Sequence, residues 1–421
     1  MPDQSADPAR STDAQGGWRS ANFIRLWTGS TASGLATWAM PFVLGLTLLE
    51  GNMTAGELGI VLAARTAGFL GAMPVAGVLS DRFARRRVVL YASLLAAVGV
   101  SLLIVTLGHD GWAAPLVMML GAAIAGMGQG ACRPAYQAMV PLVVRRDAMQ
   151  AANAAMSISV RVTALAGPTS ATALAIVVGV QATLAVIIAL WLVSAVAPPH
   201  PSERRATGEP GARLTLGRFL RDLGEGFQEA RRHPWFMAGL GALTVVICLG
   251  YSVTGVILPT VSRDRFGGPQ LLVAATTAYT VGALVGALLI ARWRPRHQGW
   301  TALAGLALYC LVPFSLLAEL PIAVPVAAFL VAGIGIELFN VPWFTATQRE
   351  MPPERLARVT SIDFLFSYGL APVGLAAIAP ATEAFGVASV LAMCGAACLF
   401  APLVAMLPRS SRGFASRTDR G

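Results

Sequence analysis

The sequence predicts an all-α integral membrane protein with twelve transmembrane helices in two pseudo-symmetric halves of six. Of its 421 residues, 56% are hydrophobic and 12% are charged, and the charged share is about half that of a soluble domain. A membrane-spanning helix needs about 20 apolar residues, so the supply suffices for about twelve spans. This composition excludes a water-soluble enzyme, a nucleic-acid-binding protein and a disordered chain.

A polar stretch at about 198–234 separates two groups of apolar runs. We expect an N-terminal six-helix half at 21–197, a cytoplasmic linker at 198–234, a C-terminal half at 235–408 and a cytoplasmic tail at 409–421. The tail at 1–20 has no apolar core, so we expect it to be disordered rather than a cleaved signal peptide. The predicted spans cover residues 23–49, 55–79, 87–108, 114–139, 150–178, 180–197, 236–260, 271–291, 300–318, 322–347, 357–380 and 384–407.

The arginines indicate which ends of the spans face the cytoplasm. The formal net charge is +10, and basic residues cluster in the loops on the side of the N-terminus, as in the run from Arg82 to Arg87 and the pair Arg145 and Arg146. The opposite loops carry mainly acids, such as Glu50. Since positively charged loops stay in the cytoplasm, we expect both termini there and a multi-pass location in a bacterial inner (plasma) membrane.

The linker contains apolar residues at helical spacing, with charges between them. They are Leu216, Phe219, Leu220, Leu223 and Phe227. This pattern predicts an amphipathic helix. It either lies on the cytoplasmic leaflet or serves only as a linker, and the sequence leaves both open.

The segment between the second and third spans reads Gly77-Val-Leu-Ser-Asp81-Arg82-Phe-Ala84-Arg85-Arg86-Arg87. A glycine lets a neighbouring helix approach closely, the aspartate can cap a helix or pair with an arginine, and the basic run can face anionic lipid. The segment resembles the loop signature Gly-x-Leu-x-Asp-Arg-x-Gly-Arg-Arg of the major facilitator superfamily, with Ala84 where the family usually has glycine. The resemblance implies the fold of that family and a gating role for Gly77, Asp81, Arg82, Arg85 and Arg86.

A second block runs from Gly126 to Asn153. It looks like the branch of that family that includes enterobactin exporters, macrolide efflux pumps and related secretion effectors. Drug exporters usually have an arginine three residues before the position of Gln129, where this chain has Gly126, so no proton-relay role is carried over. Arg133, one turn closer to the cytoplasm, is assigned to gating, and we expect it to pair with Asp81.

The fifth span contains Gly167 and Pro168, which resemble part of the signature of antiporting exporters, Gly-x-x-x-Gly-Pro-x-x-Gly-Gly. The other three glycines of that signature are replaced by Thr163, Ala171 and Thr172. Small residues keep the close packing, so the partial match favours export. The alternative interpretation is a bent packing helix.

Five charged residues lie inside predicted spans, where an ionisable side chain is costly and usually functional. They are Arg65, Arg133, Arg161, Glu337 and Asp363. One interpretation is a cavity in which Arg65 and Arg161 bind an anionic substrate group while Glu337 or Asp363 carries a proton. The alternative is static pairing of Arg161 with Asp363 or of Arg65 with Glu337. Further candidates for the lining are Trp38, Gln129, Gln137, Tyr251, Asn340 and Trp343.

An internal repeat aligns residues 134–153 with residues 342–361, each a proline-containing helix end, a short charged loop and a new span. Repeats related by an axis along the membrane normal place a substrate site near the midplane between the halves.

No cofactor, metal or catalytic group is expected. The five cysteines lie inside apolar runs, which favours small buried thiols, and the four histidines lie in loops. The sequence has no Gly-x-x-x-x-Gly-Lys-Ser/Thr loop to bind a nucleotide phosphate. The protein is therefore not expected to be an enzyme, and an ion gradient is expected to supply its energy.

These features predict a secondary active transporter that exports an amphipathic small molecule (a drug, siderophore or secondary metabolite) in exchange for protons, by alternating access. The alternative is a proton-coupled uptake permease for a small organic solute. The expected partners are the small-molecule substrate, protons and membrane lipids, without nucleic acid, and the protein is expected to act as a monomer.

Replacing Asp81 by asparagine is expected to impair transport without preventing insertion into the membrane. The reason is that a carboxylate that caps a helix or pairs with an arginine at a gating turn loses its charge, while the shape of the side chain is kept. Transport assays normalised to the amount of inserted protein measure this effect. Normal transport by the inserted Asp81→Asn variant would reject the gating role.

Overall fold

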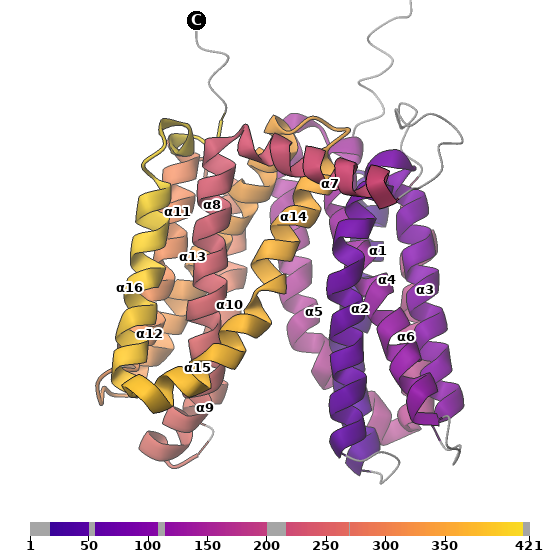
Figure 1. The fold of residues 1–421 in the computed structure, drawn as a ribbon, viewed down its shortest axis with the longest axis horizontal. Coiled ribbons are helices and arrows are strands. Elements are labelled where there is room, and N and C mark those ends of the chain that lie inside the picture. The colour runs from indigo at the N-terminus through magenta and orange to yellow at the C-terminus, as the bar shows by residue number, and fades with distance from the viewer. Residues whose placement is uncertain (1–16, 50–54, 108–113, 200–215, 269, 416–421) are drawn as a thin grey trace, which may run out of the picture. The chain divides into compact units, whose positions relative to one another are not determined.

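The computed structural model describes residues 17–49, 55–107, 114–199, 216–268 and 270–415, and these residues are helical almost throughout (Figure 1). Every predicted apolar run coincides with a helix or with consecutive helical segments. Among the described residues, nine helical stretches are long and apolar enough to cross a bilayer, and Val180–Val196 is a shorter apolar helix. The all-α membrane fold class is confirmed, while the count of twelve spans stays a prediction.

Large apolar side chains lie on the outside of these helices. Val177 is 80% exposed, Ile176 is 77% exposed and Val105 is 62% exposed. A soluble monomer rarely exposes apolar surface of this extent, because contact with water is unfavourable. Lipid tails remove that penalty, so the outer faces of these helices suit a bilayer.

The described residues belong to two compact units. The first unit comprises Met1–Ala152, Val162–Phe219 and Pro353–Arg358, and the second comprises Asn153–Arg161, Leu220–Pro352 and Val359–Gly421. Helix α5 (Met149–Val178) therefore contributes residues Asn153–Arg161 to the second unit and its remaining residues to the first.

The first unit is built around α4. Its elements are α1 (Ala21–Leu49), α2 (Ala55–Arg82), α3 (Arg85–Thr106), α4 (Ala114–Val143), the 3₁₀ turn η2 (Arg146–Ala148), most of α5, and α6 (Val180–Val196). Helix α4 packs against both α2 and α3, and α6 packs against α1 and α3.

Glycines on α4 allow this close packing. A Cβ on Gly126 would lie 2.0 Å from the carbonyl oxygen of Arg65, and a Cβ on Gly130 would lie 2.2 Å from that of Phe69, both on α2. Small residues let membrane helices come into backbone contact, which is a main source of their association energy. The same closeness explains why Gly126 stands where drug exporters usually have an arginine, because no side chain fits there.

The second unit repeats this arrangement around α13. Its elements are residues Asn153–Arg161 of α5, most of α7 (Leu216–Arg231), α8 (Pro234–Val245), η3 (Val246–Tyr251), α9 (Ser252–Phe266), α10 (Gln270–Arg292), α11 (Gln298–Ala307), η4 (Leu308–Cys310), α12 (Leu311–Ser315), α13 (Ala323–Glu350), most of α14 (Leu356–Gly369), α15 (Ala371–Phe385), α16 (Val387–Ala405) and η5 (Arg409–Arg412). Helix α13 packs against α10 and α11. A Cβ on Gly333 would lie 2.1 Å from the carbonyl oxygen of Tyr279.

Two spans of the second unit are irregular. The π-helical turn η3 connects α8 and α9 without ending the helical path, and α14 and α15 are separate rods that meet at Leu370 (Figure 1). Pro372, at the start of α15, cannot donate a backbone hydrogen bond to the preceding turn. Both irregularities leave backbone groups available for contacts that a regular helix would use internally.

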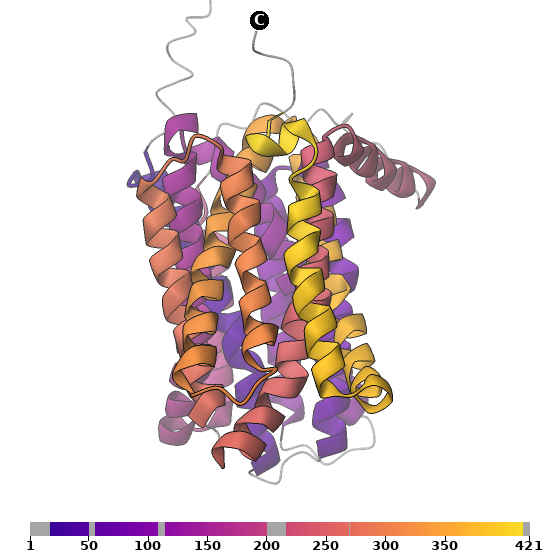
Figure 2. The same cartoon turned by 90° about the vertical axis from the view of Figure 1, so that its left-hand side faces the viewer.

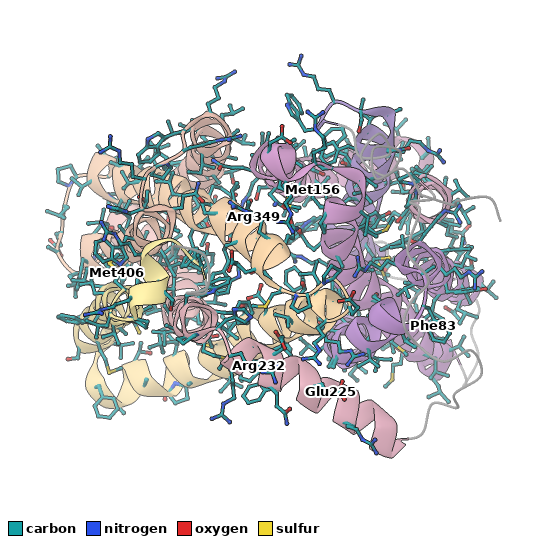
Figure 3. All side chains as sticks on the ribbon, turned by 90° about the horizontal axis from the view of Figure 1, so that it is seen from above. Phe83, Met156, Glu225, Arg232, Arg349 and Met406 are labelled. Atoms are coloured by element: carbon teal, nitrogen blue, oxygen red, sulfur yellow. The ribbon has the colours of Figure 1, made fainter. Side chains whose placement is uncertain are left out.

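Helix α7 occupies the predicted linker and turns sharply into α8. In the second unit it extends sideways from the end of α8 (Figure 2). Seen from that end, the stretch from Glu225 to Arg232 lies across the view (Figure 3). The side chains of Leu216, Phe219, Leu220 and Leu223 lie outside the described residues, so the choice between a leaflet-bound helix and a linker stays open.

Substituting Gly130 by alanine is expected to destabilise the first unit by about 1–3 kcal/mol, because the new methyl group overpacks a backbone contact. Gly71, on the neighbouring helix α2, has nothing within 4 Å of an added Cβ and serves as the matched control. Each purified variant is heated in detergent, and the fraction of protein that stays monodisperse is measured at each temperature. The midpoint of this curve reports the stability of the variant. Equal midpoints for Gly130→Ala and Gly71→Ala would contradict the packing argument.

Candidate functional site

A buried ion pair links α5 and α13 in the second unit. The Nε and Nη2 atoms of Arg161 lie 2.8 Å and 2.7 Å from the same oxygen, Oε1 of Glu337. The Glu337 side chain is fully buried, and its other oxygen, Oε2, has no hydrogen-bond partner among the described residues. The static pairs considered from the sequence joined Arg161 to Asp363 and Arg65 to Glu337. Both of those predicted pairings are wrong, because Arg161 forms its ion pair with Glu337.

Three tyrosines lie beside this ion pair. The guanidinium carbon of Arg161 is 5.7 Å from the ring centre of Tyr279, whose hydroxyl shares a hydrogen bond with that of Tyr251. The rings of Tyr251 and Tyr309 are stacked with centroids 4.5 Å apart. Cation–π attraction and ring stacking hold the cluster together, and the hydroxyls give it a polar edge.

The π-helical turn η3 ends at Tyr251. Gly250, the preceding residue, has no room for a side chain, because a Cβ there would lie 2.8 Å from the Tyr309 ring. Single π-helical turns inside α-helices are frequent at functional sites. Here the turn sets the register in which Tyr251 meets the other two tyrosines.

Asp363, the second predicted proton carrier, has a different environment. Trp343 donates a hydrogen bond from Nε1 to Asp363 Oδ2 at 3.2 Å, and Ser367 donates to Oδ1 at 3.4 Å. Trp343 is itself fully buried and stacks on Phe236 with ring centroids 4.9 Å apart. We infer that the proposed substrate-lining role does not suit Trp343, because it is a packed core residue that holds Asp363.

Arg65 lies near the middle of α2, in the first unit. Its Nη2 donates to the carbonyl oxygen of Thr37 on α1 at 3.0 Å. Pro41, four residues after Thr37, has no N–H, so the helix itself cannot satisfy that carbonyl. An arginine in the middle of a membrane helix costs about 2.5–3.5 kcal/mol on insertion scales, and this bond recovers part of that cost.

The signature residues of α5 pack against α1. A Cβ on Gly167 would lie 3.0 Å from the Cβ of Trp38, and the Trp38 side chain is 41% exposed. Thr163 stands where the exporter signature has its first glycine, and it faces Gly34, where a Cβ would lie 2.9 Å from the threonine hydroxyl oxygen. The small residue that this contact needs is therefore on the opposite helix. Pro168 continues the same helix.

The remaining lining candidates are placed on α4 and α13. Gln129 is buried, with its Nε2 atom 3.7 Å from the sulfur of Met40 and its Oε1 atom without a described partner. Gln137 on α4 and Asn340 on α13 are half-buried. The structure brings Tyr251, Arg161 and Glu337 together in the second unit, and it places Trp38, Arg65 and Gln129 in the first.

The loop signature makes backbone contacts within the first unit. Arg85 donates to the carbonyl oxygen of Ala138 at 3.0 Å and to that of Pro353, and Arg86 donates to that of Pro198 at 3.1 Å. Gly77 is buried and Arg133 is half-buried. The side chains of Asp81 and Arg82 lie outside the described residues, so the Asp81–Arg133 pair stays a prediction.

The sequence interpretation missed several polar residues at this site. Tyr279 and Tyr309 are isolated hydroxyl-bearing aromatics inside apolar spans, a signal that could have found them. Asn153 also belongs here, because its amide donates to Thr345 at 3.0 Å and exchanges hydrogen bonds with Gln348 at 2.8 Å and 3.2 Å. The first turns of α5 therefore contact α13 at two polar points, two helical turns apart along α5.

Comparison with known proteins agrees with this architecture. The model of the Major Facilitator Superfamily matches residues 26–375, which is most of the chain. The chain belongs to the major facilitator superfamily. This membership confirms the resemblance found in the loop signature and makes the protein a transporter rather than an enzyme.

Individual relatives and solved structures of this superfamily are similar over nearly the whole chain. Macrolide efflux protein A of Streptococcus pyogenes is 23% identical over 381 residues, covering 87% of this chain and 90% of that protein. The crystal structure of the human organic anion transporter MFSD10 (TETRAN) has a TM-score of 0.71 at 14% identity, covering 91% of this chain and 99% of the other. A bacterial homologue of the iron transporter ferroportin, in an outward-facing state, has a TM-score of 0.72 at 16% identity, covering 91% and 98%.

Removing one partner of the buried ion pair is expected to cost more stability than removing both. Arg161→Met leaves the Glu337 carboxylate buried and unpaired, which should lower the free energy of unfolding by about 3–5 kcal/mol. The double variant Arg161→Met with Glu337→Gln also removes the buried negative charge, so it should regain most of that lost stability. Thermal unfolding in detergent reports the difference.

The matched control is Arg145→Met, which breaks the exposed pair with Asp147 and should cost less than about 1 kcal/mol. If the Arg161→Met variant were as stable as this control, Glu337 would not depend on Arg161 for its charge.

Proposed function

We propose that the protein exports an amphipathic small molecule from the cytoplasm across the bacterial inner membrane, with both termini in the cytoplasm, and that a proton returns in exchange. The family establishes transport. Export is supported by relatives named macrolide efflux protein and by the partial exporter signature at Gly167 and Pro168. Proton coupling is supported by Glu337.

The observation that carries the proposal is the one-sided pairing of the buried Glu337 side chain. Arg161 occupies Oε1 through two nitrogens, and Oε2 has no described partner. A proton that binds at Oε2 neutralises the carboxylate without first displacing Arg161. The neutral acid then holds Arg161 less tightly, because the attraction between two opposite charges is lost and only hydrogen bonding of the guanidinium to a neutral carboxyl group remains.

Release of Arg161 connects protonation to movement of α5. The segment of α5 from Asn153 to Arg161 contacts α13 at two points. One is the Arg161–Glu337 ion pair, and the other is the pair of reciprocal side-chain hydrogen bonds between Asn153 and Gln348. When the ion pair weakens, the hydrogen bonds of Asn153 to Gln348 and Thr345 still join the two helices. Protonation therefore shifts the balance between arrangements of α5 against α13, which is the change that alternating access requires.

The tyrosine cluster supplies a surface for an amphipathic substrate. Tyr251 and Tyr279 are half-buried and offer ring edges and hydroxyls to apolar and polar groups, while the buried Tyr309 supports Tyr251 by stacking on it. Tyr279 also touches Arg161, so a bound substrate and the proton site influence each other. Asp363 serves as a second proton candidate, held by Trp343 and Ser367.

Glu337→Gln is expected to abolish proton-driven transport while the protein still inserts and binds drug. In inverted membrane vesicles, accumulation of a radiolabelled macrolide, and then of a panel of amphipathic drugs, should require a proton gradient and be indifferent to ATP. The matched control is Glu350→Gln, the same substitution at the end of α13, which should transport normally.

Two results would contradict this proposal. One is ATP-driven accumulation after the proton gradient has been collapsed. The other is gradient-dependent accumulation by Glu337→Gln at the rate of the unmodified protein.

A further inference from the structure

The two mid-span arginines differ in how their charge is compensated. Arg161 has Glu337 at 2.7 Å, so that pair is neutral as a unit. Arg65 has no described carboxylate within ion-pair distance, and its Nε is buried without a hydrogen-bond partner. Within the described part of the first unit, the charge of Arg65 therefore has no counter-charge.

The sequence of the first unit explains this lack. Helices α1, α3, α4, α5 and α6 contain no aspartate or glutamate. Helix α2 carries Glu57 eight residues before Arg65 and Asp81 sixteen residues after it, which places them about 12 Å and about 24 Å away along the helix axis. Neither can reach the guanidinium as an ion-pair partner.

The hydrogen bond from Arg65 to Thr37 does not require a charge. The Thr37 carbonyl needs one donor, because Pro41 supplies none, and Nη2 of Arg65 donates to it at 3.0 Å. The neutral side-chain amide of a glutamine at position 65 could donate the same hydrogen bond. The guanidinium has five N–H groups, so most of its donors and its full charge are not accounted for by this contact.

We propose that Arg65 binds an oxyanion group (a carboxylate, sulfonate or phosphate) of an amphipathic ligand, and that Arg161 does not. The planar guanidinium matches such groups with two parallel hydrogen bonds, and its Nε has no hydrogen-bond partner among the described residues. The ligand supplies the counter-charge that the first unit lacks. This inference rests on the proposed transport function for the identity of the ligand, which is the exported molecule.

A binding experiment with probes of one shape and three charges tests this assignment. The full-length protein is placed in phosphatidylcholine nanodiscs, and fluorescence anisotropy measures the binding of 1-pyrenebutyrate, 1-pyrenebutanol and 1-pyrenebutylamine at fixed ionic strength. The unmodified protein is expected to prefer the anion over the alcohol by about tenfold or more, the effect of a hydrogen bond to a charged group.

The variants separate the charge of Arg65 from its structural bond. Arg65→Gln should lose the preference for the anion, and Arg65→Lys should keep part of it. Since Arg65→Gln alone can fail to fold, the double variant Pro41→Ala with Arg65→Gln restores a backbone donor to Thr37 and should fold while still lacking the preference. The matched control is Arg25→Gln, which also removes an arginine that donates to a backbone carbonyl, that of Ala197, and should keep the preference.

The proposal is overturned if the double variant binds the anion as the unmodified protein does, because Arg65 then serves only the Thr37 carbonyl. It is also overturned if the unmodified protein binds the three probes equally. Competition by phosphatidylglycerol, seen with the unmodified protein and absent with Arg65→Gln, supports an oxyanion site and identifies a lipid phosphate as its occupant. Because binding is measured without a gradient, failure here leaves Glu337-dependent transport untouched, and failure of transport leaves this result standing.

Discussion

A bilayer offers no water to a buried charge or to a free backbone carbonyl, and the arrangement of this protein depends on that constraint. Each polar group inside a span must find its partner within the protein. Pro41 frees the carbonyl of Thr37 and Arg65 satisfies it. Arg161 and Glu337 satisfy each other. The candidate site residues therefore lie where a backbone carbonyl or a charged side chain inside a span needs a hydrogen-bond or ion-pair partner.

Close packing through glycine makes these partnerships possible. Two α4 glycines bring α4 to the backbone of α2 at Arg65 and Phe69, and Gly333 brings α13 to α10 at Tyr279. In both units a charged or polar residue of the site lies on the helix that the glycines contact. Residues that lack a side chain thus fix the positions of the long polar side chains that carry the chemistry.

The two units use their arginines differently, and the difference follows from composition. The second unit places an acid on α13, so Arg161 becomes half of a neutral pair whose protonation can loosen it. Among the described residues of the first unit, no carboxylate lies within ion-pair distance of Arg65. Under the two proposals made above, the Arg161–Glu337 contact changes with protonation during the transport cycle, and the fixed charge of Arg65 binds the exported molecule.

The sequence by itself determined the membrane class, the positions of the helices, the family and which charged residues lie inside apolar helices, because hydropathy and a loop signature are local properties. The pairing of Arg161 with Glu337, rather than with Asp363, was decided by tertiary structure, since 176 residues separate the partners and spacing along one helix says nothing about which helices meet. Tyr279 and Tyr309 were missed for the same reason. Each stands out in its own span only by its hydroxyl group, and the sequence does not show that the π-helical turn and the glycines bring these spans together.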